Sequence, residues 1–331
     1  MPFIRGLDLS RRFYEETVRP LLDAHFPNLP HTAARIGRGS EVQGFDTERS
    51  TDHDWGPRLH LFVQAARPDV ADLLDTEPHW GEVVPIATWF TGHLGFDPRN
   101  EVSTSDWLAT PTQTLAEVTG GAVFHDDLGL SLARERLAWY PDDVWRYVLA
   151  CQWQHLSQEE AFVGRSGEVG DELGSAVVAA RQVRDVMRLV LLMRRRYPPY
   201  SKWLGSAFAR LSLPDLTDVL RSALAATTWQ AREAHLAEAY STVARMHNAL
   251  SLTSPVDPTT RPYHSRPYKA LHAERFADAL MATVPALSDR GFVGAIDQYV
   301  DSSDVLERRD RSRAVALTWS PAPLPPEGSW S

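Results

Sequence analysis

The chain has 331 residues, of which 43% are hydrophobic and 23% are charged, and its formal net charge is −9 at pH 7. This composition is typical of a globular protein with room for about two domains, and the negative charge does not favour a surface that attracts nucleic acid as a whole. The one cysteine, Cys151, excludes an intramolecular disulfide and a cysteine-based zinc site.

The sequence also bears on location. No stretch approaches the ~20 consecutive apolar residues of a membrane span. The first residues, MPFIRGLDLSRRFYEE, lack the apolar core of a secretory signal. These features predict a cytoplasmic protein without a membrane partner.

The N-terminal part alternates short helical and extended patterns. Apolar residues at helical spacing predict a helix over residues 10–25 with Ser10 as its N-cap. The following elements are predicted to be a strand end at 35–37, a short helix from Glu41, a strand at 59–63, a helix at 68–76, a strand at 82–87, a loop at 92–100, short helices at 105–115 and a strand at 122–124. Pro85 predicts an edge position for the strand at 82–87.

A possible ligand site begins at Gly39 and Ser40 and continues at Asp52 and Asp54. Side chains i and i+2 of a strand point to one face, so the two carboxylates are predicted to project side by side from the start of the strand at 59–63. Carboxylates suit Mg²⁺, and backbone N–H groups at a Gly-Ser turn can bind phosphate oxygens. Each feature alone is more often an ordinary turn or strand end, but together they predict a site for a nucleotide and its metal.

Other polar residues accompany this segment. Arg49 and Arg58 flank the two aspartates and could bind phosphate, with local ion pairs as the alternative. The triplet His125 to Asp127 could form a metal cluster. We favour ordinary polar residues at a strand end, because the local sequence lacks the spaced partners that a metal site needs.

From residue 141 the pattern becomes helical, which predicts an N-terminal domain over 1–140, a helical domain over 141–318 and a Pro-rich disordered tail over 319–331. Helices are expected at 171–196, 215–225, 229–250 and 269–287. The acidic stretch 158–172 is predicted to face a cleft or solvent, since buried carboxylates are costly. Arg165, Glu172 and Lys202 are the candidate site residues of this domain.

The order of these motifs resembles known families. Gly-Ser followed by Asp-x-Asp is similar to the signature of the nucleotidyltransferase superfamily that includes DNA polymerase β and kanamycin nucleotidyltransferase. The strings DHDWGPRL, GRSGEVGDELGS, YPPYSKWLG and RMHNAL resemble DUF4037, a bacterial family of nucleotidyltransferase-like proteins, over roughly Arg35 to Val300. The resemblance implies an α+β fold, in which a polymerase-β-like domain with a short mixed sheet precedes an all-helical domain.

The resemblance also implies an activity, the transfer of a nucleoside monophosphate from ATP or another NTP to a hydroxyl or similar group. Its expected residue roles are Asp52 and Asp54 for Mg²⁺, Gly39 and Ser40 for the β and γ phosphates, Arg165 and Lys202 for additional positive charge, and Glu82 or Glu172 as proton acceptor. The superfamily usually carries a third carboxylate in the middle of its third strand, and the run at 82–87 has an acid only at Glu82.

This departure motivates one alternative, and other residues suggest further ones. A nucleotide-binding or sensing module, or an antitoxin-like module, could keep the fold without turnover. A dinucleotide or P-loop protein is not favoured, because Val42 occupies the third glycine position of G-x-G-x-x-G and the P-loop string is missing from the sequence. The acids of the helical domain fit a small cationic acceptor such as an aminoglycoside, although they could equally face solvent, and a tRNA or protein acceptor stays open.

Overall fold

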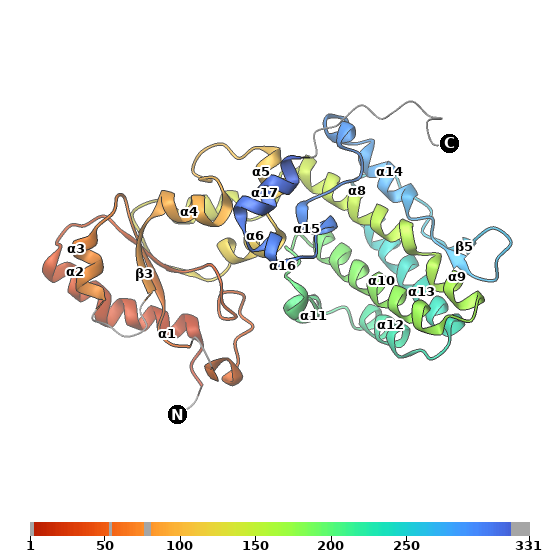
Figure 1. The fold of residues 1–331 in the computed structure, drawn as a ribbon, viewed down its shortest axis with the longest axis horizontal. Coiled ribbons are helices and arrows are strands. Elements are labelled where there is room, and N and C mark those ends of the chain that lie inside the picture. Colours follow the sequence, from red (N-terminus) through yellow and green to blue (C-terminus); the bar gives the residue numbers. More distant parts are fainter. Residues whose placement is uncertain (1–2, 53–54, 76–80, 319–331) are drawn as a thin grey trace. The chain divides into compact units, whose positions relative to one another are not determined.

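The computed structural model describes residues 3–52, 55–75 and 81–318. The chain forms two compact units, which can be followed along the sequence in Figure 1. The first contains Met1–Trp139 together with Ser303–Arg313, and the second contains Tyr140–Ser302 together with Ala314–Ser331. The disordered tail predicted over 319–331 lies outside the described residues.

The segment Ser303–Arg313 belongs to the first unit, whereas the sequence pattern predicted it to be part of the helical domain. Two ion pairs connect this segment to the first unit. Arg313 lies 2.7 Å from Asp106, and Glu307 lies 3.4 Å from Arg38. A segment distant in sequence therefore joins the first unit through contacts that local periodicity does not encode.

The first unit is built on a mixed four-stranded sheet. Its strands are β1 (Thr32–Arg35), β2 (Leu59–Val63), β3 (Gly81–Pro85) and β4 (Ala122–Asp126), in the spatial order β3-β2-β1-β4. Strand β1 is antiparallel to β2 and β4, and β2 is parallel to β3. This arrangement confirms the predicted short mixed sheet. Strand β3 lies at an edge, as its proline requires.

The helices of the first unit are short. They are α1 (Gly6–Phe13), the π-helical turn η1 (Tyr14–Val18), α2 (Arg19–His25), the 3₁₀ helix η2 (Glu48–Asp52), α3 (Pro68–Leu74), α4 (Ile86–Leu94), α5 (Thr104–Ala109), α6 (Thr112–Thr119), α7 (Leu130–Arg136), α16 (Ser303–Leu306) and the start of α17 (Arg309–Leu317). Ser10 is not the predicted N-cap, because the helix begins at Gly6 and the Ser10 hydroxyl donates to the Gly6 carbonyl at 2.9 Å. The predicted loop at 92–100 is wrong in its first residues, which finish α4.

The core of this unit joins the N-terminal helices to the sheet. Its fully buried members come from η1 and α2, from β1 and β2, and from α3, and they are Tyr14, Val18, Leu22, Ala33, Leu59, Leu61, Val70 and Leu74. Burying a large apolar side chain stabilises a fold by about 1.5–3 kcal/mol. The sheet is therefore held rigidly at the strands from which the candidate site extends.

The second unit is helical, which confirms the predicted fold class. Its elements are α8 (Asp142–Glu159), α9 (Phe162–Glu168), α10 (Glu172–Met193), α11 (Ser201–Ala209), α12 (Pro214–Ala225), α13 (Trp229–Ala249), a hairpin of β5 (Arg261–Pro262) and β6 (Lys269–Ala270), α14 (Glu274–Met281), the 3₁₀ helix η3 (Pro285–Arg290) and α15 (Ile296–Tyr299). Among the described residues, no helix combines the length and the apolar character needed to span a bilayer.

The long helix predicted over 269–287 is wrong. Lys269 pairs in the β5–β6 hairpin and α14 begins only at Glu274. Between them, the buried carboxylate of Glu160 accepts the backbone N–H groups of Leu271 and Ala273 at 2.7 and 3.0 Å. This tertiary contact satisfies donors that a continuous helix would have used. It also corrects the prediction that the acidic stretch 158–172 faces only a cleft or solvent, because Glu160 is 6% exposed.

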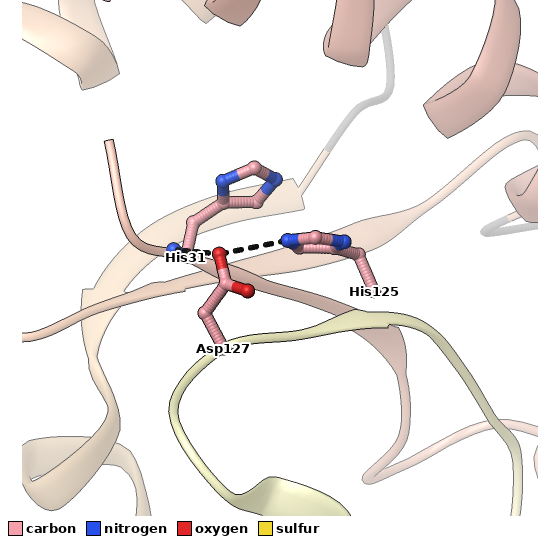
Figure 2. A group of neighbouring side chains, drawn as sticks. All are labelled: His31, His125 and Asp127. Atoms are coloured by element: carbon pink, nitrogen blue, oxygen red, sulfur yellow. Dashed lines mark hydrogen bonds and ion pairs between the residues drawn. The ribbon is translucent and has the colours of Figure 1, made fainter. Parts of the chain in front are cut away.

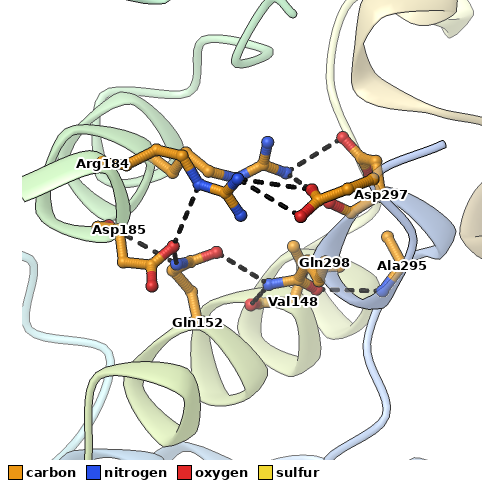
Figure 3. A network of polar contacts seen from close by, with 9 residues as sticks. Val148, Gln152, Arg184, Asp185, Ala295, Asp297 and Gln298 are labelled. Atoms are coloured by element: carbon orange, nitrogen blue, oxygen red, sulfur yellow. Dashed lines mark hydrogen bonds and ion pairs between the residues drawn. The ribbon is translucent and has the colours of Figure 1, made fainter. Parts of the chain in front are cut away.

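A polar network holds α15 to α8 inside the second unit (Figure 3). The Gln298 amide donates to the Val148 carbonyl at 3.0 Å and to the Gln152 side chain at 3.2 Å. Arg188 lies 3.0 Å from the Asp297 carboxylate. Buried polar groups are stable only when partnered, so this network specifies how the last short helix packs against the helices of its unit.

Candidate functional site

The loop after the central strand has a backbone that requires glycine. Strand β1 ends at Arg35, and Gly37 and Gly39 follow with φ of +84° and +144°. A Cβ atom at Gly39 would lie 2.6 Å from the Arg35 guanidinium and 2.6 Å from the Glu41 carboxylate. Both the dihedral angle and the available space therefore restrict this position to glycine.

The short helix predicted from Glu41 is wrong. Residues 40–44 form a hydrogen-bonded turn instead, in which the Phe45 N–H donates to the Ser40 carbonyl at 2.8 Å. Gly44, with φ of +68°, ends the turn in the left-handed region. The Gly39-Ser40 pair therefore lies in a loop and not at the N-terminus of a helix.

A buried ion pair packs against the loop at 37–40. Arg35 lies 2.6 Å from Glu41, and both side chains are 5% exposed. The Arg35 guanidinium also donates to the carbonyls of Ile36 and Arg38. Burial lowers the pKa of Arg35, and the Glu41 carboxylate opposes this shift. The arginine stays charged and ties the end of β1 to both sides of the glycine turn.

Arg58 brings a second guanidinium to the same carboxylate. Its Nη2 lies 3.3 Å from Glu41, and its side chain is one-third exposed. Its Nε is buried and has no hydrogen-bond partner within the described part of the chain. Two guanidinium groups beside one carboxylate leave a local positive charge next to the loop, although the whole chain is negative. An unsatisfied donor on a charged group is costly, and an anion bound there would satisfy it.

The structure places Asp52 differently from the prediction. It is the exposed last residue of η2 and not part of a strand, since β2 begins at Leu59. Asp54 lies outside the described residues, so the predicted side-by-side orientation of the two carboxylates is not described. The helix η2 nevertheless lies beside the glycine loop, because its Ser50 hydroxyl is 3.5 Å from that of Ser40.

Arg49 and Glu82 are exposed. Arg49 belongs to η2. Glu82 stands opposite His60 in the parallel pairing of β3 with β2, and their side chains approach to 3.8 Å. Burial lowers the pKa of His60 to about 3, so this histidine is neutral near pH 7 and the contact is not an ion pair. The Glu82 carboxylate is 54% exposed and keeps access to solvent.

Three candidates belong to the second unit. Glu172, the first residue of α10, accepts the Trp229 N–H at 3.1 Å and lies 3.1 Å from the buried guanidinium of Arg232. These contacts give Glu172 a structural role at the start of α13. Arg165 lies over the ring of Phe162 in α9 and Lys202 over that of Trp203 in α11, and both cations are exposed.

A comparison with protein-family models matches residues 107–204 to "Domain of unknown function (DUF4037)". Among solved structures, a nucleotidyltransferase-like protein from Exiguobacterium sibiricum is similar at 12% sequence identity and a TM-score of 0.35, with 86% of this chain and 91% of that chain covered. No curated protein sequence matches significantly.

The DUF4037 match confirms the predicted family. Its residues run from α5 to α11 and include Arg165, Glu172 and Lys202. They do not include the loop at 37–40 or the aspartates that follow it, so the family match does not bear on that loop.

Sequence reasoning missed Arg35 and Glu41 as components of the site. One feature of the sequence could have indicated Arg35, namely a charged residue at the end of a short apolar segment, which forms the buried strand β1. A buried arginine requires a partner, but Glu41 could be identified as that partner only from the shape of the turn.

Proposed function

We propose that this protein is a nucleotidyltransferase that moves a nucleoside monophosphate, preferentially AMP from ATP, to a hydroxyl or similar group and releases pyrophosphate. The observation that supports this proposal best is the loop at 37–40. Its Gly39 and Ser40 are half-buried and lie against the buried Arg35–Glu41 pair, beside an Arg58 guanidinium whose buried Nε has no partner within the described part of the chain. This combination fits an anion with several oxygens, such as a polyphosphate.

The loop would bind the β and γ phosphates. Backbone N–H groups around Gly39 and the Ser40 hydroxyl would donate to phosphate oxygens, and Arg58 would satisfy its Nε on the same group. Arg35 does not contact the nucleotide in this proposal. It positions the loop through Glu41 and through the carbonyl bonds it makes.

Asp52 and Asp54 are the proposed ligands of Mg²⁺. Their carboxylate oxygens are the ligands that this hard cation prefers, and the Ser40–Ser50 contact brings the helix of Asp52 to the loop. Bound Mg²⁺ would neutralise charge that develops on the phosphates during transfer. The pair is therefore expected to matter for transfer more than for folding.

Residues outside the loop are proposed for the remaining roles. Glu82, which is exposed and carries the only acid of β3, would accept the proton of the acceptor group. Glu172, already engaged by Arg232, is the second choice. Arg49, Arg165 and Lys202 stay predictions as phosphate contacts.

The acceptor proposed is a small cationic molecule, because the chain as a whole has a net charge of −9 and opposite charges favour encounter. A nucleic-acid acceptor would require a local basic groove on a protein of net charge −9.

The test uses the full chain with Mg²⁺ and NTPs labelled at the α-phosphate, against a panel of aminoglycosides, other metabolites and tRNA. We expect label to enter one acceptor class, and Asp52→Asn and Asp54→Asn each to lower the rate by about 100-fold or more, the range seen when a group that stabilises transition-state charge is removed. Asp72→Asn, an exposed aspartate in α3, is the matched control and should transfer label normally.

The outcomes separate the two candidate functions. Transfer that persists in Asp52→Asn and Asp54→Asn would remove both residues from the metal site. Binding of ATP and Mg²⁺ without pyrophosphate release across the whole panel would favour a nucleotide-sensing or antitoxin-like module. The absence of a mid-strand acid in β3 motivates this alternative.

A further inference from the structure

Three side chains outside the proposed nucleotide site converge at one end of the sheet (Figure 2). His31 immediately precedes β1, His125 lies in β4, and Asp127 immediately follows β4. The antiparallel register pairs Ala33 with His125, and the Asp127 N–H donates to the His31 carbonyl at 3.0 Å. Directly opposed residues share a face, as do residues i and i+2, so the strand pairing places the three side chains on the same face.

The three groups are close enough to share one ligand. One ligand atom from each side chain lies within 4.8 Å of the others. His125 Nε2 is 2.8 Å from the Asp127 carboxylate, and the two imidazole rings are 4.4 Å apart between centroids. Ala33, opposite His125, is small and leaves room for the ring on this face.

The hydrogen bonds of His31 assign its tautomer. Its Nδ1 is 2.9 Å from the Leu29 carbonyl, which can only accept, so Nδ1 carries the proton. Its Nε2 therefore carries a lone pair and accepts a hydrogen bond from the Tyr14 hydroxyl at 3.0 Å. Metal-binding histidines typically have this arrangement, in which the other nitrogen donates to a backbone carbonyl.

We propose that His31, His125 and Asp127 form a binding site for a transition-metal cation, with Zn²⁺ as the preferred ion. Two imidazoles and one carboxylate suit Zn²⁺ and its neighbours in the series better than Mg²⁺ or Ca²⁺, which prefer oxygen ligands alone. Three protein ligands leave a fourth position of a tetrahedral ion for water. The site is distinct from the proposed magnesium site, whose ligands are carboxylates of another segment.

Binding requires only modest side-chain movement. Zinc–ligand bonds of about 2.0–2.1 Å put tetrahedral ligand atoms about 3.3 Å apart, so atoms within 4.8 Å must approach by no more than about 1.5 Å. The Tyr14 hydroxyl must turn away from His31 Nε2, and His125 must exchange its hydrogen bond to Asp127 for a shared ion. The bound ion would link the start of β1 to the end of β4.

The test is zinc binding by the full chain, measured by calorimetry after removal of metal with a chelator and dialysis. We expect one ion per chain, with an affinity at least about 10-fold lower in His125→Ala and in Asp127→Asn. His272→Ala replaces a histidine with a similar carboxylate neighbour, Glu274 at 3.3 Å, and should bind zinc normally. Asp52→Asn should also bind normally, which excludes zinc uptake by the proposed magnesium site.

Two further readouts keep the test independent of folding. Both substituted residues are at least partly exposed, and far-UV circular dichroism of each variant verifies that it is folded. Visible absorption of the cobalt-loaded protein should indicate nitrogen ligands and lose that signature in His125→Ala. The proposal is overturned if the unaltered protein binds no zinc in a one-to-one ratio, or if folded His125→Ala and Asp127→Asn bind it as tightly as the unaltered chain.

Discussion

The ion pair beneath the loop at 37–40 leads to a quantitative prediction. Arg35→Met removes the guanidinium and keeps a side chain that can fill most of its space. The Glu41 carboxylate, 5% exposed, then retains only the longer 3.3 Å contact with Arg58. Removing one partner of a buried pair costs about 3–5 kcal/mol, because the other charge stays buried. We expect the free energy of unfolding of the first unit to fall by this amount.

The double variant Arg35→Met/Glu41→Leu separates the ion pair from the rest of the arginine's contacts. It has no isolated buried charge, and it loses chiefly the bonds from Arg35 to the carbonyls of Ile36 and Arg38. Each intramolecular hydrogen bond contributes about 1 kcal/mol net to stability. We therefore expect the free energy of unfolding of the double variant to fall by about 2 kcal/mol. It should therefore be more stable than Arg35→Met alone.

The assay must report the first unit by itself, since two compact units need not unfold together. Native-state hydrogen exchange of peptides that cover β1 and β2 provides this measurement. Arg19→Met is the matched control in the same unit, because its pair with Asp23 is 56% and 72% exposed and should contribute less than about 1 kcal/mol. Our account of the loop is refuted if Arg35→Met loses less than about 1 kcal/mol, or if the double variant is the less stable of the two.

Three further predictions concern other residues. Gly39→Ala should abolish ATP binding measured by calorimetry, because a Cβ there would lie 2.6 Å from two side chains, whereas Gly92→Ala, with no atom within 4 Å, should leave binding unchanged. Arg58→Gln should weaken ATP binding by about 10-fold, the effect of losing one charge-assisted hydrogen bond of about 1.5 kcal/mol, and unchanged affinity would remove Arg58 from the site. Burial raises the pKa of Glu160 from 4.5 to about 7. Its contribution to the stability of the second unit, about 3 kcal/mol, is therefore complete below pH 4.5 and lost as pH rises through 7. Urea unfolding between pH 4 and about 8 should show this loss in the unaltered protein and not in Glu160→Gln.

Elements with a strong local pattern were predicted well. The apolar run at 59–63 is β2, and the stripe of apolar residues over 171–196 is α10, whose N-cap Asp171 accepts the Gly174 N–H. Errors occurred where a tertiary contact competes with local preference. The expected helix at 269–287 is interrupted because Glu160, far away in sequence, takes its backbone donors.

In the candidate site, too, the residues that depend on tertiary contacts were not predicted. Gly39 and Ser40 were identified from residue type, since glycine is needed wherever a backbone turns with positive φ. The expectation that Asp52 extends from a strand was wrong, because Asp52 is the last residue of the 3₁₀ helix η2 and β2 begins only at Leu59. Neither Arg35–Glu41 nor the contact between Ser40 and Ser50 follows from spacing, since both depend on how the loop folds back.

The sequence by itself determined the strand and helix patterns, the conformational need for Gly39 and the family to which residues 107–204 belong. Those properties depend on neighbouring residues, whose periodicity and steric limits act over a few positions. Only the tertiary structure brought His31 to His125 and Arg58 to Glu41. Such contacts depend on strand register and on burial, which are set when distant segments pack together and which no local pattern encodes.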